Sequence, residues 1–268
     1  MSLPVITDHE FGQFQRFIFE AAGITLSSSK KALVSGRLAR RLAHYQLDSY
    51  SAYFRLLGSR EKPDEVQTAI DLLTTNETYF FREPAHFDFL RARALGAVGR
   101  GQPFRVWSAA SSTGEEAYSI AMVLADSLGS TPWEVFGSDI SSSVLAGARS
   151  GHYSMQRTDH IPQAYLTRYC LKGGGDHAGT LLIERAIRNK VRFAQVNLND
   201  RLPEIGLFDV IFLRNVMIYF SDDTKRDVVA RVLSKLKPGG HFCIGHSESL
   251  NDITTEVETL SPSIYRKP

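Results

Sequence analysis

A loop of small residues, Ser108 to Glu116, joins a strand-like segment to a helix-like segment and has the residue types that meet a nucleoside. Its sequence is Ser-Ala-Ala-Ser-Ser-Thr-Gly-Glu-Glu, and the apolar residues after it recur near a period of 3.6. Unpaired N–H groups and the helix dipole at such a helix start form a polar cradle. The loop lacks Gly-x-Gly-x-x-Gly, which counts against a dinucleotide pyrophosphate. A nucleoside ligand without a phosphate fits better, and S-adenosylmethionine is the common one.

Glu116, at the end of this loop, has two interpretations. It lies three residues after Thr113, and Thr-x-x-Glu is a capping box that closes a helix N-terminus. Alternatively, its carboxylate accepts hydrogen bonds from the ammonium or hydroxyl groups of a bound nucleoside amino acid. The sequence leaves both roles open.

Asp139 follows the next predicted strand, at the edge where an open α/β sheet places its ligand. It lies about 23 residues past Glu116, where Rossmann-like folds place the acid that binds ribose hydroxyls. The alternative is an acid that helps to cap the following helix, although Ser141 is also suited to that cap. We predict the ribose role for Asp139.

Two later strands also end in polar residues. Asn197 and Leu198 follow the first of them, where an amide and an apolar wall would suit the adenine edge, although an asparagine in a turn needs no ligand. The second runs into Arg214-Asn215-Val216-Met217-Ile218-Tyr219-Phe220. Methyltransferases that act on base amino groups commonly have Asn-Pro-Pro-Tyr or Asp-Pro-Pro-Tyr here, and this segment has no proline. A flipped-base substrate is therefore disfavoured.

The segment Thr74 to Pro84 is unusually dense in polar and aromatic residues for a linker. Asn76 and Thr78 are suited to turns, and Phe80 and Phe81 to a core. Arg82 lies beside that apolar pair, where its charge requires a partner. A carboxylate is the natural one, because the guanidinium fork binds it through two hydrogen bonds.

The elements that position these residues fall into two patterns, which change between about residues 75 and 100. Residues 10 to about 73 have helical periodicity, whereas from Phe104 strands alternate with helices, as in a parallel sheet covered on both faces. The sequence predicts an α/β, Rossmann-like domain with a small N-terminal helical domain, divided as 1–75 and 76–268. The predicted strands are 104–109, 133–138, 190–196, 208–214, 241–246 and 262–266, and the predicted helices after residue 100 are 114–127, 141–149, 161–170 and 222–236.

Two segments within this arrangement suggest docking surfaces. The segment 30–41 has five basic residues and no acid. On a helix Lys30, Arg37, Arg40 and Arg41 share one side, and Val34, Leu38 and Leu42 fall on another. A solvated basic face is the plainer alternative. The glycine-rich segment 172–179 predicts a turn into a short hairpin, within an inserted β-subdomain at about 171–192, and it is either a docking surface or a bare loop.

Composition excludes several other classes of protein. The 268 residues are 43% hydrophobic and 22% charged, which is ordinary for a globular protein. The longest apolar runs are strand-sized and the first ten residues are unlike a signal peptide, so we expect a cytoplasmic protein with no membrane insertion. The two cysteines form neither a disulfide framework nor a zinc cluster, and we expect no metal. The net charge of +2 does not by itself imply nucleic-acid binding.

Taken in order, these motifs resemble the chemotaxis receptor methyltransferases, the CheR family, over essentially the whole chain. The resemblance is carried by the segments 76–82, 107–116, 138–140, 214–220 and 245–248. It implies a protein-glutamate O-methyltransferase that uses S-adenosylmethionine, releases S-adenosylhomocysteine and forms glutamate methyl esters on methyl-accepting chemotaxis receptors. It also implies cofactor contacts from Asn76, Thr78, Arg82, Glu116, Asp139, Asn197, Leu198, Arg214 and Asn215.

The resemblance also assigns roles in catalysis and in substrate binding. Arg82 and Tyr219 would lie near the methyl group, and Lys30, Arg37, Arg40 and Arg41 would face the acidic, helical cytoplasmic region of the receptor. In some members of the family the β-subdomain binds a peptide from the receptor C-terminus by strand addition, and for this chain that stays open. Two alternatives are a methyltransferase of RNA or a small molecule, and a non-catalytic regulator that binds S-adenosylmethionine.

Overall fold

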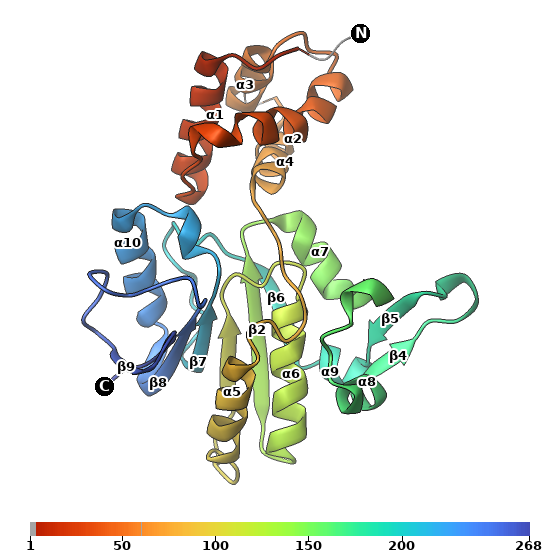
Figure 1. Ribbon diagram of the computed structural model, residues 1–268, viewed down its shortest axis with the longest axis vertical. Coiled ribbons are helices and arrows are strands. Elements are labelled where there is room, and N and C mark those ends of the chain that lie inside the picture. The colour runs from red at the N-terminus through yellow and green to blue at the C-terminus, as the bar shows by residue number, and fades with distance from the viewer. Residues whose placement is uncertain (1–3, 60) are drawn as a thin grey trace. The chain divides into compact units, whose positions relative to one another are not determined.

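The computed structural model describes residues 4–59 and 61–268, which divide into two compact units (Figure 1). The first unit contains the described residues up to Thr75 together with Tyr219–Lys225. The second contains Asn76–Ile218 and Arg226–Pro268. Among the described residues, none of the helices has both the length and the apolar character that a membrane span requires.

The first unit is helical, and its core is aromatic and aliphatic. Thr7 and Glu10 form a reciprocal capping box at the start of its first helix, so the N–H groups of both residues have side-chain acceptors. The face of Val34, Leu38 and Leu42 is buried, which confirms the predicted apolar side of the basic helix. The elements are α1 (Asp8–Ala22), η1 (Ser28–Lys30), α2 (Lys31–His44), α3 (Tyr50–Gly58) and α4 (Pro63–Leu73).

The second unit is built on a seven-stranded sheet in the order β6-β2-β1-β7-β8-β10-β9. The first five strands in this order pair in parallel, and β10 pairs antiparallel with both β8 and β9. Their bounds are β1 (Phe104–Ser108), β2 (Trp133–Asp139), β6 (Val191–Gln195), β7 (Phe208–Leu213), β8 (Leu236–Ile244), β9 (Glu258–Ser261) and β10 (Ile264–Arg266). The predicted alternation of strands and helices is confirmed, and β9 is a short exposed edge strand that has no buried residue to reveal it in sequence.

Helices connect and cover these strands. The helix α6 packs against β1 and β2, and α7 packs against β2 and β6. The helix α5 falls in the part of the chain for which no helix was predicted, because its apolar residues are spread around the helix rather than along one side. The helices are α5 (Ala85–Leu95), α6 (Glu115–Leu128), α7 (Ser142–Ser150), α8 (Gln163–Tyr169), α9 (Arg185–Arg188) and α10 (Asp222–Leu233).

A small second sheet lies between α7 and β6 in the sequence. Its strands are β3 (His152–Ser154), β4 (Cys170–Lys172) and β5 (Thr180–Ile183), in the order β3-β5-β4 and all antiparallel. The glycine-rich turn joins β4 to β5, so the predicted hairpin is present. The sheet is larger than the predicted range of about 171–192, since β3 begins at His152 and residues from Val191 belong to the large sheet. The strand β3 has only three residues, which is too short for an alternating sequence pattern to be visible.

Candidate cofactor site

The order of the large sheet gathers the polar residues that follow its parallel strands. The strands β6, β2, β1 and β7 are consecutive neighbours, and Ser108 at the end of β1 is in register with both Gly137 in β2 and Phe212 in β7. The chain builds outward from β1 in both directions, so the boundary between β1 and β7 is a topological switch point. Ligands of open α/β sheets bind at the carboxyl ends of the strands beside such a point.

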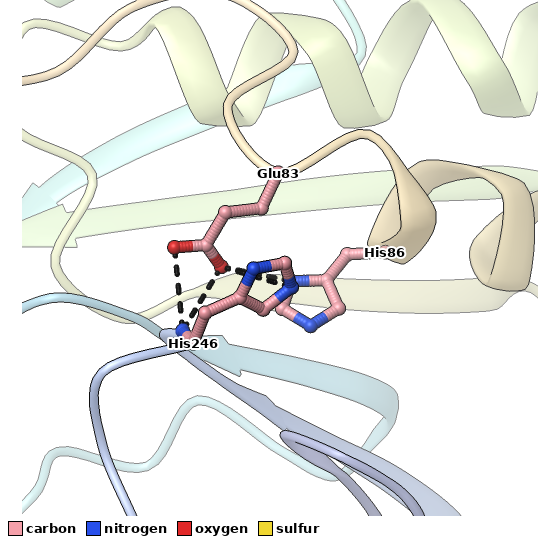
Figure 2. Close-up of side chains that lie close together, drawn as sticks. All are labelled: Glu83, His86 and His246. Atoms are coloured by element: carbon pink, nitrogen blue, oxygen red, sulfur yellow. Dashed lines mark hydrogen bonds and ion pairs between the residues drawn. The ribbon is translucent and has the colours of Figure 1, made fainter.

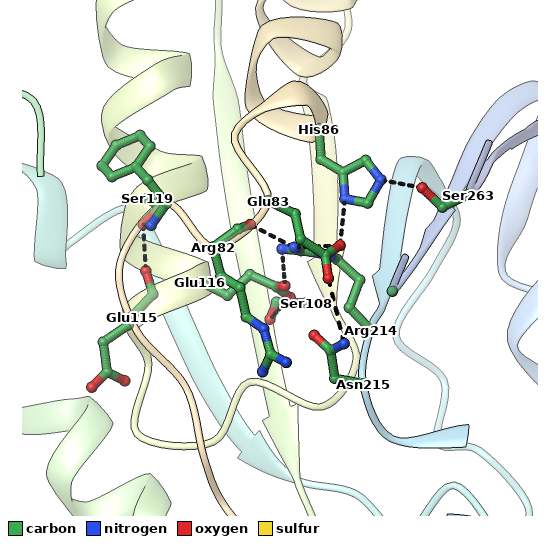
Figure 3. A network of polar contacts seen from close by, with 12 residues as sticks. Arg82, Glu83, His86, Ser108, Glu115, Glu116, Ser119, Arg214, Asn215 and Ser263 are labelled. Atoms are coloured by element: carbon green, nitrogen blue, oxygen red, sulfur yellow. Dashed lines mark hydrogen bonds and ion pairs between the residues drawn. The ribbon is translucent and has the colours of Figure 1, made fainter. Parts of the chain in front are cut away.

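Arg214, directly after β7, is the centre of a buried charge group (Figure 3). Its Nη1 is 2.9 Å from Glu116 Oε2 and its Nη2 is 2.9 Å from Glu83 Oε2. Nη2 also donates to the backbone carbonyl of Arg82. The Arg214 side chain is 1% exposed, against 13% for Glu83 and 12% for Glu116, so both carboxylates retain some access to a ligand.

This group has one more carboxylate than guanidinium. Burial alone would lower the pKa of Arg214, but the charges of Glu116 and Glu83 outweigh it and raise that pKa. Burial would raise the pKa of Glu83, and the charge of Arg214 outweighs it and lowers that pKa. Two carboxylates and one guanidinium give the three side chains a formal net charge of −1.

The capping-box interpretation of Glu116, one of the two left open by the sequence, is wrong. Gly114, in the left-handed region at φ 96°, is the N-cap of α6, and Thr113 donates to Glu115 instead. Glu116 Oε1 accepts from the Ser108 hydroxyl at 2.8 Å, and Oε2 pairs with Arg214. The Glu116 carboxylate therefore pairs with Arg214, 98 residues away in the chain, and does not cap the helix as the local pattern suggested.

Asp139 is buried and organises the backbone around it. Its Oδ2 accepts from the Ser112 N–H at 2.8 Å, and its Oδ1 accepts from the Ser141 N–H at 3.0 Å. The carboxylate thus holds both the loop after β1 and the start of α7. The second contact agrees with the capping alternative, and binding to ribose stays a prediction. Ser111, in the same loop, has a buried hydroxyl without a hydrogen-bond partner, so the loop retains polar capacity beside Asp139.

Asn197 and Leu198 follow β6, at the same edge of the sheet. Asn197 Oδ1 accepts from the Asn199 N–H at 3.0 Å, and its Nδ2 donates to Asp200 at 2.8 Å. These are the contacts of an asparagine turn, and Leu198 is buried with 7% exposure. Their contact with an adenine ring stays a prediction.

The segment between α4 and α5 contacts this edge of the sheet through the backbone of Asn76 and Thr78. The Asn76 carbonyl accepts from the Ser112 hydroxyl at 2.9 Å, and the Thr78 carbonyl accepts from Arg157 at 3.2 Å. Arg82 is half-buried, and its Nη1 donates to the Glu77 carbonyl at 3.2 Å. Within the described residues Arg82 has no ion pair with a carboxylate, although the sequence indicates that it requires one.

The four basic residues predicted to bind substrate separate into two kinds in the first unit. Arg37 donates to the carbonyls of Leu73 and Thr74 at the end of α4, and Arg41 forms two hydrogen bonds with the buried carboxylate of Glu65. Those two side chains hold the unit together, contrary to the expectation of a shared free face. Lys30 and Arg40 are exposed.

Tyr219 belongs to the same unit as these basic residues by its contacts, whereas Arg82 belongs to the second unit. The Tyr219 carbonyl accepts from the Thr25 N–H at 2.8 Å, which fixes its backbone.

Two carboxylates that the sequence analysis did not single out organise this site. Glu83 pairs with Arg214, and Glu248 accepts from the backbone N–H groups of Asn215 at 2.9 Å, Gly245 at 2.7 Å and Met217 at 2.8 Å. Glu248 therefore fixes the segment after β7 that carries Asn215. The signal was present in Gly245-His246-Ser247-Glu248 at the end of the predicted strand 241–246, where a buried acid is rarely left without donors.

Glu83 also lies beside two histidines (Figure 2). Its Oε2 is 3.5 Å from His86 Nδ1 and 3.7 Å from His246 Nε2. Burial, with a further contribution from the charge of Arg214, lowers the pKa of His86 to about 4, so this ring is neutral at pH 7. The three groups lie close enough to share a metal ion, but Arg214 already supplies a cation to the same oxygen at 2.9 Å. The arrangement is better suited to holding Glu83 and Arg214 in place.

The carboxylates of this site suit S-adenosylmethionine, which is cationic at its sulfonium and ammonium groups. Glu83, Glu116 and Asp139 outnumber the guanidinium of Arg214, and Arg214 Nε is buried without a hydrogen-bond partner. The site thus offers carboxylate acceptors to a cationic ligand. Arg214, Asn215, Glu116, Asp139, Asn76, Thr78, Arg82, Asn197 and Leu198 remain the residues that we predict to bind it.

The fold and this site define an S-adenosylmethionine-binding protein of the methyltransferase class. Residues 76–265 match the model described as "CheR methyltransferase, SAM binding domain", and residues 9–74 match "CheR methyltransferase, all-alpha domain". The chain belongs to the CheR methyltransferase family, which confirms the resemblance in its sequence.

Curated relatives are similar over nearly the full length. The chain is 41% identical to the chemotaxis protein methyltransferase of Salmonella typhimurium over 97% of this chain and 90% of that protein. It is 41% identical to the chemotaxis protein methyltransferase of Escherichia coli over 97% of this chain and 91% of that protein. It is 40% identical to chemotaxis protein methyltransferase 2 of Pseudomonas aeruginosa over 97% of this chain and 93% of that protein.

Proposed function

We propose that this protein methylates glutamate side chains of chemotaxis receptors in the cytoplasm and forms methyl esters. Family membership supports methyl transfer from S-adenosylmethionine, and the names of the relatives support chemotaxis proteins as substrates. The single observation that favours a carboxylate substrate is the set of contacts that Arg82 makes. Its guanidinium has no carboxylate partner among the described residues, while its own carbonyl is held by Arg214 at the centre of the charge group.

The reaction requires little acid–base chemistry from the protein. A glutamate with a pKa of about 4.3 is already ionised at neutral pH, so its oxygen is a nucleophile without a general base. S-adenosylmethionine, when bound, supplies an electrophilic methyl group. The remaining task for the chain is to orient the carboxylate oxygen and to exclude water from it.

Arg82 and Tyr219 are the side chains that we assign to the glutamate. The Arg82 fork can hold a carboxylate through two hydrogen bonds, and the Tyr219 hydroxyl can donate a third. A guanidinium that bound the ground state as tightly as the transition state would give no acceleration, so Arg82 acts in positioning. Two carboxylates would support these side chains indirectly. Glu248 fixes the backbone at Asn215 and Met217, and Glu83 holds the Arg214 guanidinium.

The function is tested by labelled methyl transfer to a receptor cytoplasmic fragment, with esters detected by their lability in base. The wild-type protein should transfer label in base-labile form. Arg82→Ala or Tyr219→Phe should lower turnover by about tenfold or more, because each variant loses one hydrogen bond to the glutamate. Equal turnover in both variants would remove these assignments. Base-stable label, or label on RNA or a small molecule instead, would show a methyltransferase of another substrate.

For receptor docking we propose Lys30 and Arg40, because Arg37 and Arg41 are engaged within the first unit. Their charges would attract an acidic substrate helix and make association sensitive to salt. Lys30→Glu with Arg40→Glu should weaken receptor methylation at low salt, and Arg201→Glu, a charge reversal at another exposed arginine, serves as the control. Unchanged methylation in the double variant would leave this helix as a solvated face. Peptide binding by the small sheet is a separate proposal that the same assay tests with and without the receptor C-terminus.

A further inference from the structure

A cavity lies at the opposite end of the parallel strands from the cofactor site. Its volume is about 500 Å³, and it is bounded by the C-terminal end of α5, the first residue of β1 and the beginnings of β7 and β8. Arg266 of the antiparallel β10 and Leu260 of β9 complete its wall. These are the amino ends of the parallel strands, whereas the residues of the cofactor site follow the carboxyl ends.

The charges around this cavity are unbalanced. Its acid, Asp209, is already paired with Lys237 at 2.8 Å and accepts from the Arg105 N–H at 2.8 Å. Three further cations line it, at Arg93, Arg100 and Arg266. Within the described residues none of these three guanidinium groups has an ion pair with a carboxylate. A concave site with unpaired arginines concentrates positive potential.

Part of this positive wall is held in place by packing. Phe89 contacts the Arg93 guanidinium at 5.3 Å from its ring centroid, and its ring packs edge-on against His241 at 5.1 Å. His241 is half-buried, and burial first, then the charges of Arg93 and Arg266, lowers its pKa. His241 therefore lies near both arginines in the wall of the cavity. A guanidinium that is already positioned loses less entropy when it binds an anion.

We propose that this cavity binds a small phosphorylated molecule of about the size of a nucleoside diphosphate. Arginine forks match the geometry of phosphate oxygens, and the volume lies within the range of small-molecule sites, roughly 300–1,000 Å³. The apolar surface of Phe104 and Leu260 in the same wall can contact the part of the ligand that carries no phosphate. This volume is that of a small-molecule site and is too small for an extended nucleic acid or peptide.

Calorimetric titration of the full-length protein with ADP, and separately with inorganic pyrophosphate, tests this site. Both titrations are carried out with S-adenosylhomocysteine at saturation, so that an adenosine moiety cannot report on the cofactor site. We expect saturable binding of ADP that weakens as salt is added, with pyrophosphate retaining part of the affinity. Absence of heat up to about 1 mM of either compound would overturn the proposal.

Matched variants locate the binding. Arg93→Ser and Arg266→Ser should each weaken ADP binding by about tenfold or more, as expected for losing one hydrogen-bonded charge. Arg201→Ser removes the same charge from another exposed position and should leave the dissociation constant unchanged. Equal affinity in all three variants, displacement of ADP by S-adenosylhomocysteine, or binding of an RNA oligonucleotide or acidic peptide without ADP would each contradict the proposal. Thermal melting confirms that each variant is folded.

Discussion

Two buried arginine–carboxylate groups in this molecule use the same chemistry for different purposes. In the first unit Arg41 pairs with Glu65, which also accepts from the hydroxyls of Tyr45 at 2.9 Å and Tyr53 at 2.6 Å. In the second unit Arg214 pairs with two carboxylates, those of Glu83 and Glu116. The first group balances its charge, and the second has an excess carboxylate.

The pattern of exposure is reversed between the two groups. The Glu65 side chain is 3% exposed and Arg41 is 24% exposed, so the carboxylate is closed off and the guanidinium reaches solvent. Arg214 is 1% exposed, and its two carboxylates are the more accessible members. Burial would raise the pKa of Glu65, but Arg41 and the two tyrosine hydroxyls lower it, so the pair is satisfied without a ligand. The balanced, closed group needs no ligand, whereas we propose that the excess carboxylate of the second group interacts with a cationic ligand.

The largest effect is expected from Arg214→Met. Removing this guanidinium leaves Glu83 and Glu116 buried side by side without a cation, which should lower the free energy of unfolding by about 3–5 kcal/mol. Methyl transfer and cofactor binding should both be lost even in the folded fraction. Urea unfolding and calorimetric binding of S-adenosylhomocysteine measure the two effects. Full cofactor affinity in a folded variant would break the comparison, because Arg214 would then serve structure alone.

A smaller and purely structural effect is expected from Arg41→Met. The Glu65 carboxylate keeps two tyrosine donors, so the cost should be about 2–3 kcal/mol, below that of a fully unpaired buried charge. The affinity for S-adenosylhomocysteine should not change. Urea unfolding reports the destabilisation. Lys62→Met is the matched control, because Lys62 is exposed at the N-cap of α4, the helix that carries Glu65. A loss of cofactor affinity that matched the loss in Arg214→Met would show that the two groups are not separate in function.

The smallest effect is expected from Glu116→Gln, which keeps the shape of the side chain and removes the excess charge. Stability should change little, because Glu83 still neutralises Arg214. Affinity for the cationic cofactor should fall about tenfold, or about 1.4 kcal/mol. Comparing S-adenosylmethionine with the neutral-sulfur product S-adenosylhomocysteine sharpens this test. An equal loss for both ligands would place the interaction away from the sulfonium, and no loss for either would contradict a role for the excess carboxylate.

Sequence alone determined the classes of element and the edge of the sheet that carries the site. Strand periodicity, the small-residue loop and acids at strand ends are local properties, so β1, β2 and the position of Asp139 at the end of β2 were predictable. The same holds for the buried face of Val34, Leu38 and Leu42. The helix α5 was not predictable, because its apolar residues do not form one stripe.

Tertiary structure alone decided which charges meet. Glu116 lies 98 residues from Arg214, and Arg41 lies 24 residues from Glu65, and neither distance leaves a periodic signal. The capping box at Thr113 was locally reasonable, but a buried guanidinium gains more from a carboxylate than one helix end does. Likewise, a row of basic residues has the same sequence whether its members face solvent, as Arg40 does, or hold the fold, as Arg37 does. The physical reason is that pairing between charges depends on position in space, whereas a sequence pattern reports only position along the chain.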